Sequence, residues 1–115
     1  MKLVNLQFLR EFCHNDQNKM VNYIHMFLES APEQLELIKK HTTSGNWNGV
    51  KAAAHSLKPQ VVFMGMSSIE PILARIEDNI ISENSFDQIP FLSNELDVQL
   101  GYAFSELIET LVTLS

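Results

Sequence analysis

Apolar residues recur every three or four positions along most of the chain, which is the spacing of amphipathic α-helices. The pattern predicts a short first helix and four longer ones, joined by turns and by one loop at 83–89. The helices are expected at 6–12, from the cap at 16 to about 41, 47 to about 64, from a cap at 67 or 68 to about 82, and 90–114. Only Val61-Val62-Phe63 is β-prone, over a short run, so the chain is predicted to be all-α.

Polar caps and turn residues mark the ends of these helices. Asp16 is a suitable N-cap for the second helix, and Ser67 or Ser68 for the fourth. The turn Ser44-Gly45-Asn46 ends the second helix and caps the third, and Pro90 opens the last.

Three of the helices carry a clear apolar stripe on one face. In the second helix the stripe is Met20, Ile24, Phe27, Ala31, Leu35 and Ile38. In the third it is Val50, Ala53, Ala54, Leu57, Val61 and Met64. In the last it is Leu92, Leu96, Leu100, Ala103, Leu107, Leu111 and Leu114. Amphipathic helices with short connections predict an antiparallel four-helix bundle with a short extra N-terminal helix.

Length and composition fit one small domain, residues 1–115. The chain is 45% hydrophobic, enough to form a core, and its apolar runs are too short to cross a membrane. The net charge of −6 argues against nucleic acid as a partner, because nucleic-acid-binding surfaces are basic. The single cysteine, Cys13, excludes an internal disulfide and favours a reducing compartment. We therefore expect a cytoplasmic monomer, and the initial Met and helical end at Ser115 favour a free-standing protein.

His55 is the most informative residue for function. On a helical wheel it lies roughly 150° from the middle of the apolar stripe, so its ring is expected to face solvent. Lys51 and Lys58 flank it one turn before and one turn after, and the compact residues Ala52 and Pro59 lie beside it. An exposed imidazole with two ammonium groups nearby suits an incoming anion that another protein delivers.

The run around His55 resembles the histidine-containing phosphotransfer (HPt) domain family. The residues that carry the resemblance are His55-Ser56-Leu57-Lys58, the position after them, and Gly65 ten positions beyond the histidine. The resemblance extends over nearly the whole chain, through Phe27–Leu35, Gly45-Asn46-Trp47 and Ile76-Glu77-Asp78. The family most often has Gly where this chain has Pro59.

The resemblance implies a helical bundle that passes a phosphoryl group between receiver aspartates, or from a kinase to a receiver. His55 would be the phosphoryl acceptor, and Lys58 would neutralise charge on the transferring oxygens. Glu77 matches a carboxylate that in some members accepts a hydrogen bond from the ring nitrogen that is not phosphorylated, which would leave Nε2 as the nucleophile. The partners would be receiver domains of response regulators and hybrid histidine kinases. No cofactor is expected, and no metal, because the receiver carries the Mg²⁺. Kinase activity of its own would need a separate ATP-binding domain, for which a chain of 115 residues has no room.

The candidate receiver-docking face surrounds the histidine. It comprises Lys51, Ala52, Pro59, Val62, Phe27 and Leu28. Phe27 also fits the core, Lys51 and Lys58 also fit a solvated surface, and Glu77 fits an ordinary helix surface equally well. Gly65 would be structural, as the end of the third helix and a point of close packing for the next.

Other functions are weaker readings of the same residues. The alternative is a non-catalytic helical adaptor in which His55 is vestigial. A metal-binding bundle is disfavoured because no two of His14, His25, His41 and His55 have i, i+3 or i, i+4 spacing. An enzyme with a pocket is disfavoured because the sequence has no glycine-rich phosphate loop and no nucleophile elbow.

Overall fold

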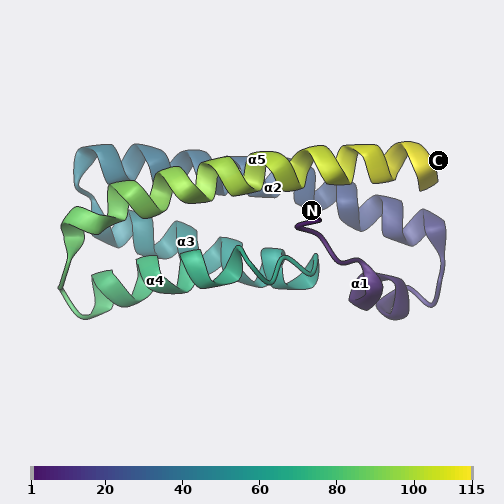
Figure 1. Ribbon diagram of the computed structural model, residues 1–115, viewed down its shortest axis with the longest axis horizontal. Coiled ribbons are helices and arrows are strands. Elements are labelled where there is room, and N and C mark those ends of the chain that lie inside the picture. The colour runs from purple at the N-terminus through teal and green to yellow at the C-terminus, as the bar shows by residue number, and fades with distance from the viewer. Residues whose placement is uncertain (1, 115) are drawn as a thin grey trace.

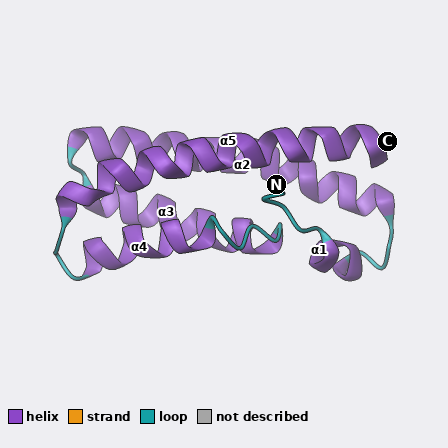
Figure 2. Cartoon of the chain, in the orientation of Figure 1, coloured by secondary structure: helices purple, strands orange, loops and turns teal. Residues whose placement is uncertain are grey.

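The computed structural model describes residues 2–114, and within that range the chain forms helices and no strands (Figures 1 and 2). In chain order the elements are α1 (Gln7–Phe12), α2 (Gln17–Ser44), α3 (Trp47–Phe63), α4 (Glu70–Ile81), the 3₁₀ helix η1 (Phe86–Gln88) and α5 (Ile89–Leu114). None of the described helices is long and apolar enough to span a membrane.

Helices α2 to α5 form the predicted antiparallel bundle, and α1 is the short extra helix. Helix α2 packs against α3 and α5, and α4 packs against the same two helices. Helices α3 and α5 therefore lie diagonally across the bundle from each other. Because α2 and α5 are longer than α3 and α4, α1 fits beyond the ends of the shorter pair, beside the start of α2 (Figure 1).

The predicted stripes form the core. Every stripe residue of α2, every stripe residue of α3 including Met64 just beyond the helix, and the α5 stripe up to Leu107 is buried. Leu111 and Leu114 are partly buried and pack against the same cluster. Cys13 is a free thiol inside this core. Helical periodicity in the sequence is therefore enough to identify which faces meet.

Helices α2 and α3 have the predicted caps. The Asp16 carboxylate accepts the Lys19 amide at 3.2 Å at the start of α2. Gly45 ends α2 in the left-handed conformation, with φ of 70°, and the Asn46 side chain accepts the Gly49 amide at 3.1 Å to begin α3. Gly45 and Asn46 thus fix the start of α3, the helix that carries His55.

The start of α4 differs from the prediction. Neither Ser67 nor Ser68 caps it; the N-cap is Ile69, whose side chain makes no cap hydrogen bond. Met66 and Ile69 are fully buried, and the Met66 carbonyl accepts the amides of Ile69 and Glu70 at 3.0 and 3.2 Å. Burial of apolar side chains, together with this backbone turn, therefore sets the start of the helix in place of a polar cap.

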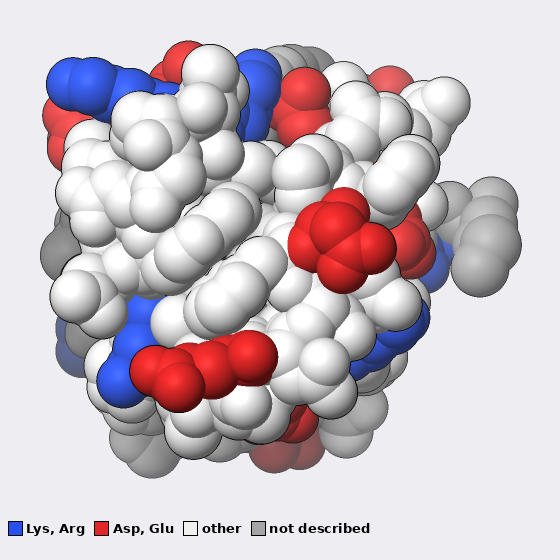
Figure 3. Space-filling model, turned by 90° about the vertical axis from the view of Figure 1, so that its left-hand side faces the viewer, with Lys and Arg blue, Asp and Glu red and all other residues white. Residues whose placement is uncertain are grey.

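The end of the bundle that holds the α2–α3 turn and the α4–α5 connection also has more helix than predicted. Helix α2 continues to Ser44, and part of the predicted loop at 83–89 forms η1 and the first residue of α5. The Phe86 ring stacks on the Trp47 ring, with centroids 5.2 Å apart. Figure 3 shows this end of the molecule, where uncharged side chains cover most of the surface. This stacking holds η1 against the start of α3.

The N-terminal segment is attached to two distant parts of the chain. The Leu3 amide donates to both carboxylate oxygens of Glu106 in α5, at 2.9 and 2.8 Å. The Asn5 carbonyl lies against Gly65, which has φ of 68° and follows the end of α3. Gly65 thus allows a close approach, as predicted, but its partner is the N-terminal segment and not the next helix.

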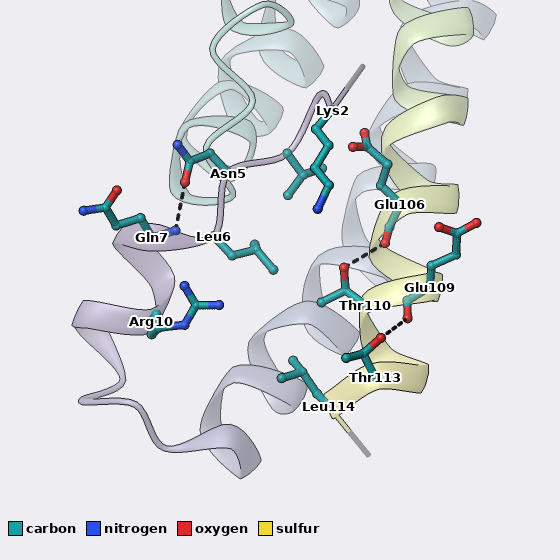
Figure 4. A pocket seen from close by; sticks show the side chains of 11 residues that line it. Lys2, Asn5, Leu6, Gln7, Arg10, Glu106, Glu109, Thr110, Thr113 and Leu114 are labelled. Atoms are coloured by element: carbon teal, nitrogen blue, oxygen red, sulfur yellow. Dashed lines mark hydrogen bonds between the residues drawn. The ribbon is translucent and has the colours of Figure 1, made fainter.

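A cavity of about 690 Å³ lies between the N-terminal segment, α1 and the last turns of α5 (Figure 4). Its lining includes the cations Lys2 and Arg10 and the carboxylates Glu106 and Glu109. No residue of α3 lines it. The cavity is therefore separate from the face that carries His55.

Replacing Gly65 with Ala should destabilise the fold. The new Cβ would collide with the Asn5 carbonyl, and the alanine would have to keep the left-handed φ of this position. We expect the free energy of unfolding, measured by urea denaturation with circular dichroism, to fall by roughly 1–3 kcal/mol. The matched control is Gly101→Ala in α5, where a Cβ meets no atom within 4 Å and should add about 0.5–1 kcal/mol of stability. A Gly65→Ala protein as stable as the wild type would contradict the packing of Asn5 on this glycine.

Candidate functional site

The outer face of α3 carries His55 in the open. Its side chain is 78% exposed, because the apolar stripe on the opposite side of α3 is buried in the bundle. Lys51, Ala52, Pro59 and Val62 are exposed on the same helix. The exposure predicted from the helical wheel is confirmed, and the ring can be reached by another molecule.

Glu77 reaches His55 from the neighbouring helix α4. Its carboxylate is buried, because the residue is only 6% exposed. The nearby Ile76 and Ile80 of the same helix are buried in the core. Glu77 Oε2 lies 3.3 Å from His55 Nδ1. Of the two alternatives left open by the sequence, the solvated surface glutamate is excluded by this burial.

Lys58 occupies the other oxygen of the same carboxylate. Its Nζ lies 3.2 Å from Glu77 Oε1, and the lysine side chain is 33% exposed. The contact has ion-pair distance, but Oε1 makes no hydrogen bond, so the attraction is mainly one of charge. Buried carboxylates need such compensation, because removing them from water is costly. One carboxylate of α4 therefore contacts two side chains that are one turn apart on α3.

The position of the carboxylate favours one tautomer of the neutral His55 ring. An ionised carboxylate can only accept hydrogen bonds, so the Nδ1 that faces Glu77 must be the donor. In the neutral ring the other nitrogen, Nε2, is then unprotonated and has a free lone pair. The contact with Glu77 therefore involves Nδ1, and Nε2 is the nitrogen on the other side of an exposed ring.

Pro59 lies inside α3, one turn after His55. Because proline has no amide hydrogen, it cannot donate to the His55 carbonyl as other residues at this position would. The next carbonyl, that of Ser56, accepts a hydrogen bond from the Gln60 side chain at 3.1 Å. The helix nevertheless continues to Phe63, so proline at this position is compatible with the α3 backbone.

A groove of about 380 Å³ begins beside Pro59 and runs between α2 and α3. Its lining is Tyr23, Met26, Phe27, Ser30, Pro59, Gln60, Phe63 and Met64. Phe27 is a correction to the expected docking face: it is 4% exposed, and its ring packs 5.9 Å from Phe104 of α5. Phe27 therefore forms the floor of the groove and belongs to the core, and Leu28 is half-buried and does not line it.

An aromatic cluster extends this apolar surface onto α1, and the sequence analysis missed it. The cluster comprises Phe8, Phe12, Tyr23 and Phe63. Its ring centroids lie between 5.3 and 6.2 Å apart, and Phe8 and Phe12 remain about half exposed. The i, i+4 spacing of Phe8 and Phe12 on one side of the short α1, with Leu9 buried between them in sequence, was the available signal.

The other histidines lie in different surroundings. His14 and His25 are exposed, and His41 Nδ1 lies 3.3 Å from the Asn46 side-chain nitrogen, near the start of α3. Within residues 2–114 no three His, Cys, Asp or Glu side chains are grouped so as to hold a metal ion. Among the described histidines, the paired carboxylate is specific to His55.

The sequence model of one family, the Hpt domain, matches residues 22–112. This chain belongs to the Hpt-domain family. The match includes α3 and α4, and with them His55, Lys58 and Glu77. Comparison with curated proteins and comparison with solved structures gave no match. Hpt domains act in histidine phosphotransfer within phosphorelays and interact with receiver domains; they are phosphotransfer modules and not kinases.

Replacing Glu77 with Leu should change the tautomer of the His55 ring in this Hpt domain. In the neutral wild-type ring we expect the proton mainly on Nδ1, and the variant should lose this preference because the carboxylate that faces Nδ1 is gone. Nitrogen NMR of the imidazole rings measures the change, and the exposed His14 and His25 serve as internal references. An unaltered Nδ1 signal in the folded variant would show that Glu77 does not set the tautomer.

Proposed function

We propose that His55 accepts a phosphoryl group from a receiver aspartate, or from a kinase, and passes it to the receiver of a response regulator. The observation that carries this proposal is the contact of Nδ1 with a buried carboxylate, which leaves Nε2 free on an exposed ring. Membership of the Hpt-domain family supports the same chemistry.

The transfer step follows from the proposed tautomer. The lone pair of Nε2 attacks the phosphorus of the receiver's aspartyl phosphate, and a P–N bond forms while the P–O bond to the aspartate breaks. The electron pair of that bond leaves on the aspartate carboxylate. His55 Nδ1 keeps its proton, and the positive charge that develops on the ring lies beside Glu77, which stabilises it. The reverse sequence gives transfer to the next receiver.

Lys58 supplies positive charge on the same side of the helix. Its ammonium is held by a charge contact and not by a hydrogen bond, and a third of the side chain is exposed. It can therefore turn from Glu77 toward the phosphoryl oxygens as negative charge approaches Nε2. Lys51, one turn before His55, is exposed and adds to the local field.

The receiver is proposed to dock over the exposed face of α3 and the adjoining groove. Ala52 and Pro59 leave room beside the ring, and Val62, 55% exposed, adds apolar surface. The groove between α2 and α3 and the aromatic cluster continue that surface. A partner that covers them brings its aspartate to His55 without any movement of the bundle.

The protein is proposed to act as a monomer in the cytoplasm. Cys13 is a buried free thiol, which suits a reducing compartment. The site is complete within one chain, because His55, Lys58 and Glu77 all come from α3 and α4.

The His55→Gln variant should lose all phosphoryl transfer. Glutamine removes the nucleophilic nitrogen from an exposed position, so the fold should be unchanged. Radiolabelled phosphoryl transfer from a phosphorylated receiver, with helicity checked by circular dichroism, gives the measurement. His25→Gln is the matched control, an exposed histidine of α2 that should keep wild-type labelling. Continued labelling of the His55→Gln protein would show that His55 is not the phosphoryl acceptor.

Bulk beside the ring should block the receiver but not a small phosphodonor. Ala52 is exposed on α3, so Ala52→Trp should fold normally while its indole stands where the receiver approaches. We expect transfer from the receiver to slow by about a hundredfold, whereas phosphoramidate should still label His55. Thr43→Trp, at an exposed position near the end of α2, is the control for an added surface tryptophan. Receiver transfer at the wild-type rate in Ala52→Trp would place the docking face elsewhere.

A further inference from the structure

The outer face of α5 carries an apolar seam that stays exposed in the folded chain. Its positions alternate in steps of three and four residues, and all are exposed: Phe91, Asn94, Val98, Gly101, Ser105, Ile108 and Val112. Phe91 is 79% exposed and Val112 75%. This spacing is that of a helix that pairs with another helix along one side, here over about 32 Å.

Gly101 lies at the middle of the α5 seam. A Cβ at this position would meet no atom within 4 Å, so the packing of the bundle does not require glycine here. Glycine inside a helix lowers its stability relative to alanine. The missing side chain at Gly101, next to the exposed Tyr102 ring, allows the backbone of a second helix to come close. Binding of such a helix would therefore explain a glycine that the packing of the bundle does not require.

The charge along the seam has one sign. Helix α5 contains four carboxylates and no Lys or Arg. Asp97 pairs with Lys39 at 3.4 Å and Glu106 accepts the Leu3 amide. Glu95 and Glu109 are exposed on the same side of the seam, and neither forms an ion pair with any residue in the range 2–114. The apolar seam is therefore bordered by two carboxylates that form no ion pair within the described residues; Glu109 also lines the cavity that contains Lys2 and Arg10.

We infer that the α5 seam binds an amphipathic helix of another protein, with apolar residues against the seam and Lys or Arg facing Glu95 and Glu109. A second copy of this chain is a poorer occupant. An antiparallel pair of α5 helices centred on Gly101 and Tyr102 sets Glu95 of one copy beside Glu109 of the other, and α5 brings no base to compensate. An anionic membrane surface is disfavoured by the same carboxylates.

A helix bound to the α5 seam would not cover the face that carries His55. Helix α5 lies diagonally across the bundle from α3, so a helix bound to the seam leaves the face of His55 free. The partner acts as a tether that holds this protein while a receiver approaches His55. The inference does not depend on phosphoryl transfer, since it rests on α5 alone.

The test uses a synthetic helical peptide as the probe. The peptide has Leu at the a and d positions and Lys at the flanking e and g positions, carries a fluorophore, and is titrated with the full chain while anisotropy is followed. A matched peptide with Glu in place of Lys measures the contribution of charge. The expected result is saturable binding of the Lys peptide, weakened by salt, and binding of the Glu peptide at least about tenfold weaker.

Variants locate the binding. The double variant Val98→Ser/Ile108→Ser should weaken the Lys peptide by at least about tenfold without a change in charge. Val62→Ser is its control on α3, because Val62 and Ile108 are both 55% exposed, and it should bind like the wild type. Gly101→Leu should raise the unfolding temperature, because leucine is a better helix former, and still lose the peptide. Its loss of binding therefore cannot come from unfolding.

Three results would overturn the inference. The first is no saturable binding of the Lys peptide, or equal binding by the wild type and the double variant. The second is a dimer in sedimentation equilibrium that the double variant abolishes, which would make a second copy the occupant. The third is binding to vesicles of anionic phospholipid that requires Val98 and Ile108, which would make the seam a membrane contact.

Discussion

The buried carboxylate of Glu77 constrains the rest of the site. A charge removed from water needs partners, and both partners come from one turn of α3: His55 for one oxygen and Lys58 for the other. Burial of the apolar stripe of α3 sets how this helix is turned toward α4, and in that orientation both side chains reach the same carboxylate. The face that remains outside, with Ala52 and Pro59 beside the ring, follows from that orientation. Stability of the helix interface and orientation of the ring are thus served by the same three residues.

Much of the fold could be predicted because helical periodicity is local information. The stripes of α2, α3 and α5 became the core, and the exposure of His55 followed from its angle to one stripe. The caps at Asp16 and Asn46 could also be predicted, since each depends on residues within one turn. The cap of α4 could not, because burial of Met66 and Ile69 sets its start, and burial depends on the whole bundle.

The position of the candidate site was predictable, and the packing around it was less so. The motif around His55 pointed to the ring, but whether Glu77 is solvated or buried depends on how closely α3 and α4 pack. The side chain of Phe27 had two reasonable directions, and its contact with Phe104, far along the chain, decides for the core. The aromatic contacts of Phe12 with Phe63 likewise join segments that no local pattern relates.

The attachment of the N-terminal segment has a consequence for how the molecule fluctuates. The hydrogen bonds between Leu3 and Glu106 join residues 103 positions apart, so they form only where α5 has packed beside the N-terminal segment. Because α1 is only six residues long and lies at the end of the bundle (Figure 1), we expect this segment and α1 to open before α2 to α5 do, with their amides exchanging with solvent hydrogen at a lower free energy than those of α3. Phe8 and Phe12 belong to that opening unit, whereas His55 does not. The apolar surface at Phe8 and Phe12 therefore depends on the free energy of opening α1, whereas the position of the His55 ring depends on the free energy of unfolding the α2–α5 bundle.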